Sequence, residues 1–149
     1  MAVNSRGYRR AVALTMKPVI QEEKTGCAIA SAAAVSGLSY RQARQIANRL
    51  GIHAGDSALW SETDYMRRLL QALGVGAGDA EKPFTGWGAL PSCALLAIKW
   101  HEVRGMAYWH WVVFVRDHDR SYVLDPKREL RNNVRTDFGR MRPKWYIEI

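Results

Sequence analysis

Helix-forming and strand-forming patterns occupy different halves of this chain. Helix signals cluster in the first half, in an alanine-rich run ended by a glycine, a segment opened by the capping-box pattern Ser39-x-x-Gln42, and a segment with apolar residues at helical spacing: residues 27–37, 39–51 and 61–74. The second half holds four apolar, aromatic or β-branched segments separated by polar turns: residues 93–100, 109–115, 121–125 and 144–149. Helices followed by strands predict an α+β domain with an antiparallel sheet.

The chain has no internal repeat or linker that would divide its 149 residues, so we expect a single domain over residues 1–149. A glycine-rich stretch over residues 74–91 is typical of a surface loop and could also border a binding cleft. Trp60, Trp87 and Trp109 are candidates for lining such a cleft, although packing in the core is the simpler interpretation of each.

The net charge of +8 would allow an acidic partner. However, the basic residues are scattered as singles and pairs, which disfavours a nucleic-acid-binding surface while leaving another anionic partner open. The apolar run within residues 1–20 is interrupted by Thr15 and Lys17, so we expect neither a signal peptide nor a membrane span. The expected compartment is the cytoplasm, and a protein exported by a dedicated secretion system would have the same sequence features.

The first of the two cysteines, Cys27, stands at the predicted start of a helix. Free backbone N–H groups and the helix dipole favour a thiolate at that position, and a nearby imidazole can accept the thiol proton. Cys93 has no comparable surroundings, and we expect it in the core. The two cysteines lack metal-type spacing, no cofactor motif is present, and nothing in the sequence places them close enough to form a redox pair.

A hairpin in the second half can supply the imidazole. If its turn is Asp117–His118, His110 lies directly opposite Asp125, close enough for the carboxylate to hold one ring nitrogen; a longer loop would leave the two as diagonal neighbours. Asp125 would then fix the tautomer of His110 and stabilise the imidazolium. Taken singly, each residue has a simpler explanation: a buried thiol, a packed histidine, and an aspartate that forms a turn before proline.

Gln21 would complete a catalytic set. The loop between it and Cys27 allows its side-chain amide to fold back beside the sulfur, where it and the Cys27 backbone N–H could donate to the oxyanion of a tetrahedral intermediate. The order nucleophile, base and orienting carboxylate, with an oxyanion donor upstream, is that of a thiol hydrolase.

This pattern resembles the double-glycine leader peptidase family of papain-like cysteine proteases, the bacteriocin-processing domains of bacterial export transporters, and its stand-alone relatives. The matching residues are Gln21, Cys27 with Ala30 after it, "HWVV" from His110 and "VLDP" ending at Asp125–Pro126. The chain has Gly26 and Ala28 where the family often has Asp and Gly. The resemblance implies a papain-like fold, in which a helical half bearing the nucleophile packs on a sheet bearing His and Asp, and thioester chemistry on an amide bond.

The leading hypothesis is therefore a cysteine peptidase that acts on a peptide or protein substrate. A glutamine deamidase or a cell-wall amidase of the toxin or effector type would use the same four residues. A basic binding module without catalytic activity is the alternative from another class.

Overall fold

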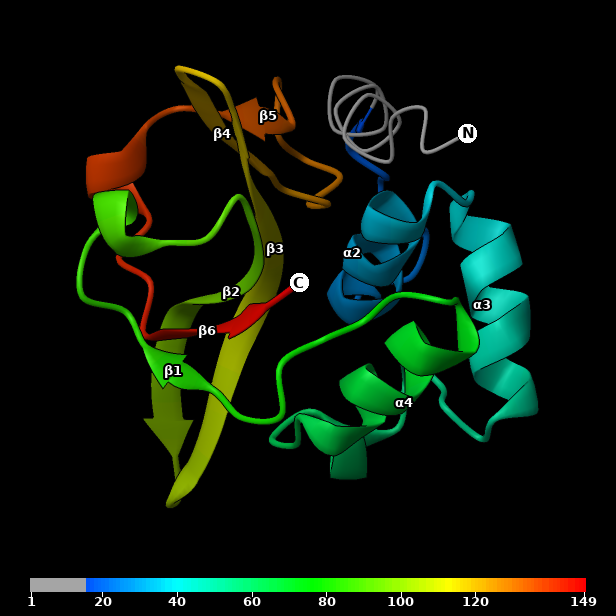
Figure 1. Cartoon of the computed structure of the whole chain (residues 1–149). Helices are drawn as coiled ribbons and strands as arrows, with labels where there is room; N and C mark the ends of the chain where they lie inside the picture. The colour runs from blue at the N-terminus through cyan, green and yellow to red at the C-terminus, as the bar shows by residue number, and fades with distance from the viewer. Residues whose placement is uncertain (1–15) are drawn as a thin grey trace, which may run out of the picture.

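In the computed structural model, which describes residues 16–149, a layer of helices packs on one face of an antiparallel sheet whose strands differ in length (Figure 1). The part described contains three α-helices, α2 (Cys27–Ser36), α3 (Tyr40–Arg49) and α4 (Asp64–Ala72), and three short 3₁₀ turns, η1 (Ser57–Leu59), η2 (Trp87–Ala89) and η3 (Phe138–Arg140). The predicted α+β class is confirmed at this level. None of the helices within residues 16–149 is long and apolar enough to cross a membrane. The expectation of no signal peptide falls largely on residues 1–15 and lies outside the described residues.

Over residues 16–149 the sheet has six strands in the order β1-β6-β2-β3-β4-β5, and all neighbours are antiparallel. The strands are β1 (Lys82–Pro83), β2 (Cys93–Val103), β3 (Met106–Asp117), β4 (Arg120–Leu124), β5 (Val134–Arg135) and β6 (Trp145–Glu148). The four predicted strands are confirmed as β2, β3, β4 and β6. The sequence analysis missed β1 and β5, because two-residue strands carry no alternation to detect.

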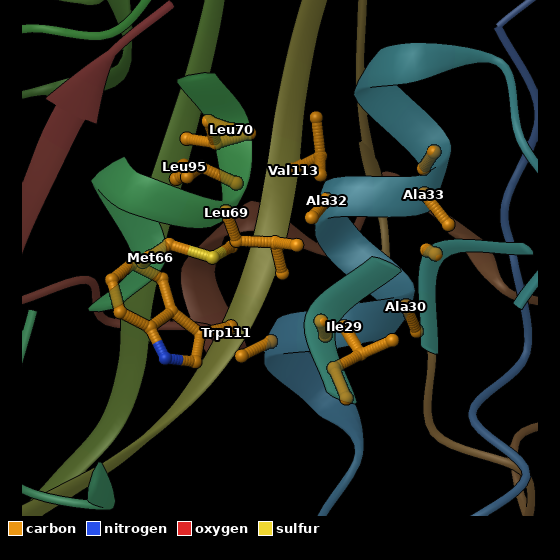
Figure 2. Packing of buried hydrophobic residues seen from close by; sticks show 14 of the residues in the cluster. Ile29, Ala30, Ala32, Ala33, Met66, Leu69, Leu70, Leu95, Trp111 and Val113 are labelled. Carbon is orange, nitrogen blue, oxygen red and sulfur yellow. The ribbon is translucent and has the colours of Figure 1, made fainter. Parts of the chain in front are cut away.

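The alanine-rich helix α2 contacts β3 and both other helices, and Figure 2 shows its alanines beside β3. Ala30, Ala32 and Ala33 are fully buried, and their small side chains let the helix backbone approach its neighbours closely. Gly37 ends α2 in the left-handed conformation, with φ 73°, as the sequence predicted. The capping box at Ser39 also forms, because Gln42 N–H donates to its hydroxyl and the Gln42 side chain accepts from its N–H.

Buried residues of β3 alternate between two cores. Trp111, Val113 and Val115 face the helices, whereas Val112 and Phe114 face the opposite side of the sheet. On that second side, loops cover the sheet with a cluster of aromatic rings from Phe84, Trp87, Phe138 and Tyr146. This alternation fixes the register of β3, since a slip of one residue would exchange the two cores.

The hairpin between β3 and β4 corrects the predicted register. The turn is His118–Asp119, because Asp117 pairs with Arg120 and Val113 pairs with Leu124; a turn at Asp117–His118 is therefore wrong. His118 adopts the left-handed conformation with φ 55°, which a two-residue hairpin turn accommodates. Continued past β4, this register sets Asp125 against Val112, so His110 and Asp125 become diagonal neighbours rather than a direct pair.

Candidate active site

Cys27 is the first residue of α2 and is half-buried. Gly26 caps the helix without a side-chain hydrogen bond, so the first-turn N–H groups keep their donor capacity toward whatever lies in front of the sulfur. A larger residue before the thiol would displace Tyr40: a Cβ at Gly26 would overlap its hydroxyl, which donates a 2.6 Å hydrogen bond to Glu23. The predicted helix start at Cys27 is confirmed.

His110 and Asp125 are joined by a hydrogen bond of 2.7 Å between Nε2 and Oδ1. The Asp125 side chain is fully buried and that of His110 is 15% exposed. Since Nε2 is bound to the carboxylate, Nδ1 is the ring nitrogen left for Cys27, which lines the same cleft as His110 and contributes to the raised pKa of the imidazole. The structure thus brings together three of the residues singled out by sequence.

Asp125 follows directly after β4 and is held by both of its carboxylate oxygens. Oδ1 also accepts from the backbone N–H of Lys127 at 3.0 Å, and Oδ2 accepts from Nη1 of Arg135 at 2.9 Å. Its own backbone N–H and C=O bond to Asn133, at 2.8 and 2.7 Å. The carboxylate is therefore fixed in place on every side, although it is entirely removed from water.

These contacts determine the protonation states of the pair. Burial alone would raise the pKa of Asp125, but the hydrogen bonds from His110, Lys127 and Arg135 outweigh it and lower that pKa to about 2. Burial alone would lower the pKa of His110, but hydrogen bonds to Asp125 and Cys27 raise it to about 9. An ionised carboxylate beside a protonated imidazole is the arrangement that stabilises a thiolate.

Gln21 lies beside His110, in the segment before α2, and its backbone N–H donates to Pro126 C=O at 3.0 Å. Its side-chain amide does not point freely at Cys27, because Nε2 donates to the carbonyls of Glu23 at 3.1 Å and Lys24 at 2.8 Å. Oε1 is buried and has no hydrogen-bond partner among residues 16–149. To act as an oxyanion donor, Gln21 has to exchange one loop carbonyl for the substrate oxygen.

A cleft of about 650 Å³ opens in front of Cys27. Its walls are mostly aromatic and come from η1, α4 and the β2–β3 hairpin: Trp60, Tyr65, His101, Tyr108, Trp109, His110 and Trp111. The Tyr65 hydroxyl accepts a 3.2 Å hydrogen bond from Trp111 Nε1, which leaves its own O–H as a donor at the Cys27 side of the cleft. Of the three candidate tryptophans, Trp60 and Trp109 line this cleft and Trp87 packs in the second core.

Cys93 lies in β2 against the main core, as predicted, and burial raises its pKa to about 12. Both cysteines are free thiols. Within residues 16–149 no group of three His, Cys, Asp or Glu side chains is arranged to hold a metal ion.

Arg135 is the contact that sequence reasoning missed. It bridges Asp125 and Asp137, with bonds of 2.9 and 2.7 Å to the two oxygens of Asp137. It lies on a two-residue strand far along the chain from His110, so neither a motif nor a periodic pattern signals it.

Replacing Arg135 with methionine should destabilise the fold by about 1–3 kcal/mol, because Asp125 Oδ2 then remains buried without a donor. Urea unfolding at pH 7 measures this change. The matched control is Asp137→Asn, which weakens only the more exposed ion pair and should cost less than about 1 kcal/mol. Equal losses in the two variants would contradict the structural role of the Arg135–Asp125 contact.

No protein-family model matches the chain, and no curated protein or solved structure shows significant similarity to it.

Proposed function

We propose that this protein is a cysteine hydrolase that cleaves amide bonds, most directly as a peptidase of the papain-like kind. The observation that carries the proposal is the 2.7 Å bond between the fully buried Asp125 and His110 Nε2, with the other ring nitrogen available to a thiol at the head of α2. A helical layer that bears the nucleophile against a sheet that bears the histidine and carboxylate also supports it.

In the proposed reaction, Cys27 Sγ attacks the substrate carbonyl carbon as a thiolate, its proton having passed to His110 Nδ1. The Cys27 N–H and the Gln21 amide donate to the resulting oxyanion. Collapse of the tetrahedral intermediate breaks the C–N bond, the amine leaves with the proton from Nδ1, and a thioester remains on Cys27. Water then attacks the thioester with His110 as general base, and this step releases the acid and restores the thiol.

Product analysis tests the proposal and separates it from deamidation. Purified protein is incubated with a mixture of casein peptides, and mass spectrometry detects new peptide termini while an enzymatic assay measures ammonia. A peptidase produces new termini that are absent with Cys27→Ala. Ammonia released without chain cleavage would indicate a glutamine deamidase instead, and no product of either kind would contradict the hydrolase proposal for these substrates.

The pH dependence of cleavage follows from the His110 pKa of about 9. Below that pH the imidazolium can give its proton to the leaving amine; above it the proton donor is lost, so kcat/KM should fall by about tenfold per pH unit. Alkylation of Cys27 needs only the thiolate and should not fall over the same range. The two rates are measured between pH 7 and 10.5, and a parallel fall in both would point to unfolding rather than to titration of His110.

A further inference from the structure

A second hollow, of about 680 Å³, adjoins the aromatic cleft at His110, which lines both. It lies where the segment before α2 meets the chain that follows β4, two segments that Figure 1 shows side by side and that the Gln21–Pro126 hydrogen bond joins. Its lining residues are Gln21, Glu22, Glu23, Lys24, Lys99, His110, Lys127, Arg128 and Glu129. We call this hollow the lysine pocket. His110 and Lys24 line both it and the cleft, whereas Cys27 lines the cleft.

The lysine pocket is lined by four basic and three acidic side chains. Within residues 16–149, none of Lys24, Lys99, Lys127 and Arg128 forms an ion pair, whereas two of the three glutamates are already engaged. Glu22 pairs with Arg41 at 3.6 Å, and Glu23 accepts the hydrogen bond from Tyr40. Because Arg41 compensates Glu22, the lining keeps a small excess of positive charge, and Lys99 and Lys127 remain available to an anionic group.

Lys99 is directed into this pocket by an irregularity in β2. The β2–β3 pairing shifts between Ile98 and His101, and Lys99 within this bulge adopts the left-handed conformation with φ 54°. Lys127 lines the same pocket, and burial together with the like charge of Lys127 lowers the pKa of Lys99. The charge of Asp125 compensates the lysines only in part, because its carboxylate is already paired with His110 and Arg135.

The positions of the two hollows relative to Cys27 and His110 indicate which part of the substrate each would hold. The acyl part of a substrate stays on Cys27 as the thioester and so occupies the aromatic cleft. The amine part receives its proton from His110, which lines both hollows, and we assign it to the lysine pocket, the hollow that Cys27 does not line.

We propose that the lysine pocket binds a carboxylate on the amine side of the cleaved bond, so that the preferred substrate has an apolar residue before the bond and an acidic group shortly after it. This inference rests on the proposed hydrolase function for the identity of the two sides. The carboxylate can be an Asp or Glu side chain or the C-terminal carboxylate of a peptide that ends just beyond the bond.

Binding to the Cys27→Ala protein tests the inference without turnover, with calorimetry as the measurement. Two matched peptide pairs serve as probes: acetyl-Phe-Gly-Glu-Ala-amide against its Gln counterpart, and acetyl-Phe-Gly-Ala with a free carboxylate against its amide. At least one acidic member should bind about fivefold or more tightly than its neutral partner, and the pair that shows the preference identifies the source of the carboxylate.

The preference should be lost with Lys99→Gln or Lys127→Gln and kept with Arg68→Gln, which removes one positive charge from the exposed side of α4. Lys99→Gly is a second variant that removes the ammonium without straining the backbone, because glycine readily adopts the φ of 54° at this position. It should lose the preference as Lys99→Gln does. Equal affinity within both pairs, undetectable binding of all four peptides, or an equal loss in Arg68→Gln would overturn the inference.

The two proposals fail separately. If the wild type cleaves nothing but peptide binding shows a carboxylate preference that depends on Lys99, the pocket proposal stands and the hydrolase proposal is rejected. If the wild type cleaves peptides without such a preference, the hydrolase proposal stands and the pocket proposal is rejected.

Discussion

Hydrolysis by the Cys27→Ala variant should fall by about 10⁴-fold or more, because the nucleophile that forms the thioester is lost while the cleft and His110 remain. The fold should be retained, since Cys27 is half-buried at a helix start and alanine is an excellent helix former. Initial rates on the peptide cleaved by the wild type measure the effect.

Cys93→Ala is the matched control for the removal of a thiol. Cys93 lies in β2, against the main core and outside the lining of both hollows, so its loss should affect stability more than the cleavage rate. A Cys27→Ala protein that keeps its rate, or a Cys93→Ala protein that loses it while folded, would contradict the assignment of Cys27 as nucleophile.

Asp125→Asn should lower the cleavage rate by about 10²–10⁴-fold and the free energy of unfolding by about 3 kcal/mol. The amide can donate to His110 Nε2 and so favours the tautomer that places the proton on Nδ1, where it cannot accept the thiol proton. With the NH₂ turned toward His110, the Asn carbonyl oxygen still accepts from Arg135, but the charge of that ion pair is lost and the Lys127 N–H loses its acceptor.

The pH dependence of stability identifies the carboxylate as the cause. The Asp125 pKa is about 2 in the folded protein and 3.8 ordinarily, so its stabilising contribution is present above pH ~4 and is lost as the pH falls through 2. The difference in unfolding free energy between wild type and Asp125→Asn should therefore shrink over that range. Asp137→Asn, at the more exposed end of the same network, should have little effect on the cleavage rate. A pH-independent difference, or an Asp125→Asn protein with the wild-type rate, would contradict the role of Asp125.

How much the sequence could predict depended on whether the signal was local. The helix that begins at Cys27 and stops at Gly37, and the capping box at Ser39, follow from residues a few positions apart, and both predictions are confirmed. The third helix begins later than predicted, at Asp64, because a separate 3₁₀ turn over Ser57–Leu59 and a short irregular segment precede it.

The site could be predicted only in part. The closeness of His110 and Asp125 was expected, but "DHDR" does not show which two residues form the turn, and the register was displaced by one pair. The bond from Arg135 to Asp125 and the bulge that directs Lys99 depend on pairing between distant segments, which a single sequence does not reveal. The hydrogen bonds from the Gln21 amide to two loop carbonyls depend on the conformation of a short irregular loop, for which the sequence has no pattern.

The most direct test of the central claim is the rate of Cys27 alkylation by iodoacetamide between pH 4 and 10, in wild type and in His110→Ala, with mass spectrometry to locate the label. A thiolate paired with the His110 imidazolium predicts that wild-type Cys27 reacts well below pH 8.5, the ordinary pKa of a thiol, and that His110→Ala loses this reactivity at low pH. Circular dichroism establishes that the variant is folded. A Cys27 that is unreactive in the wild type, or that titrates as an ordinary thiol in both proteins, would contradict the account.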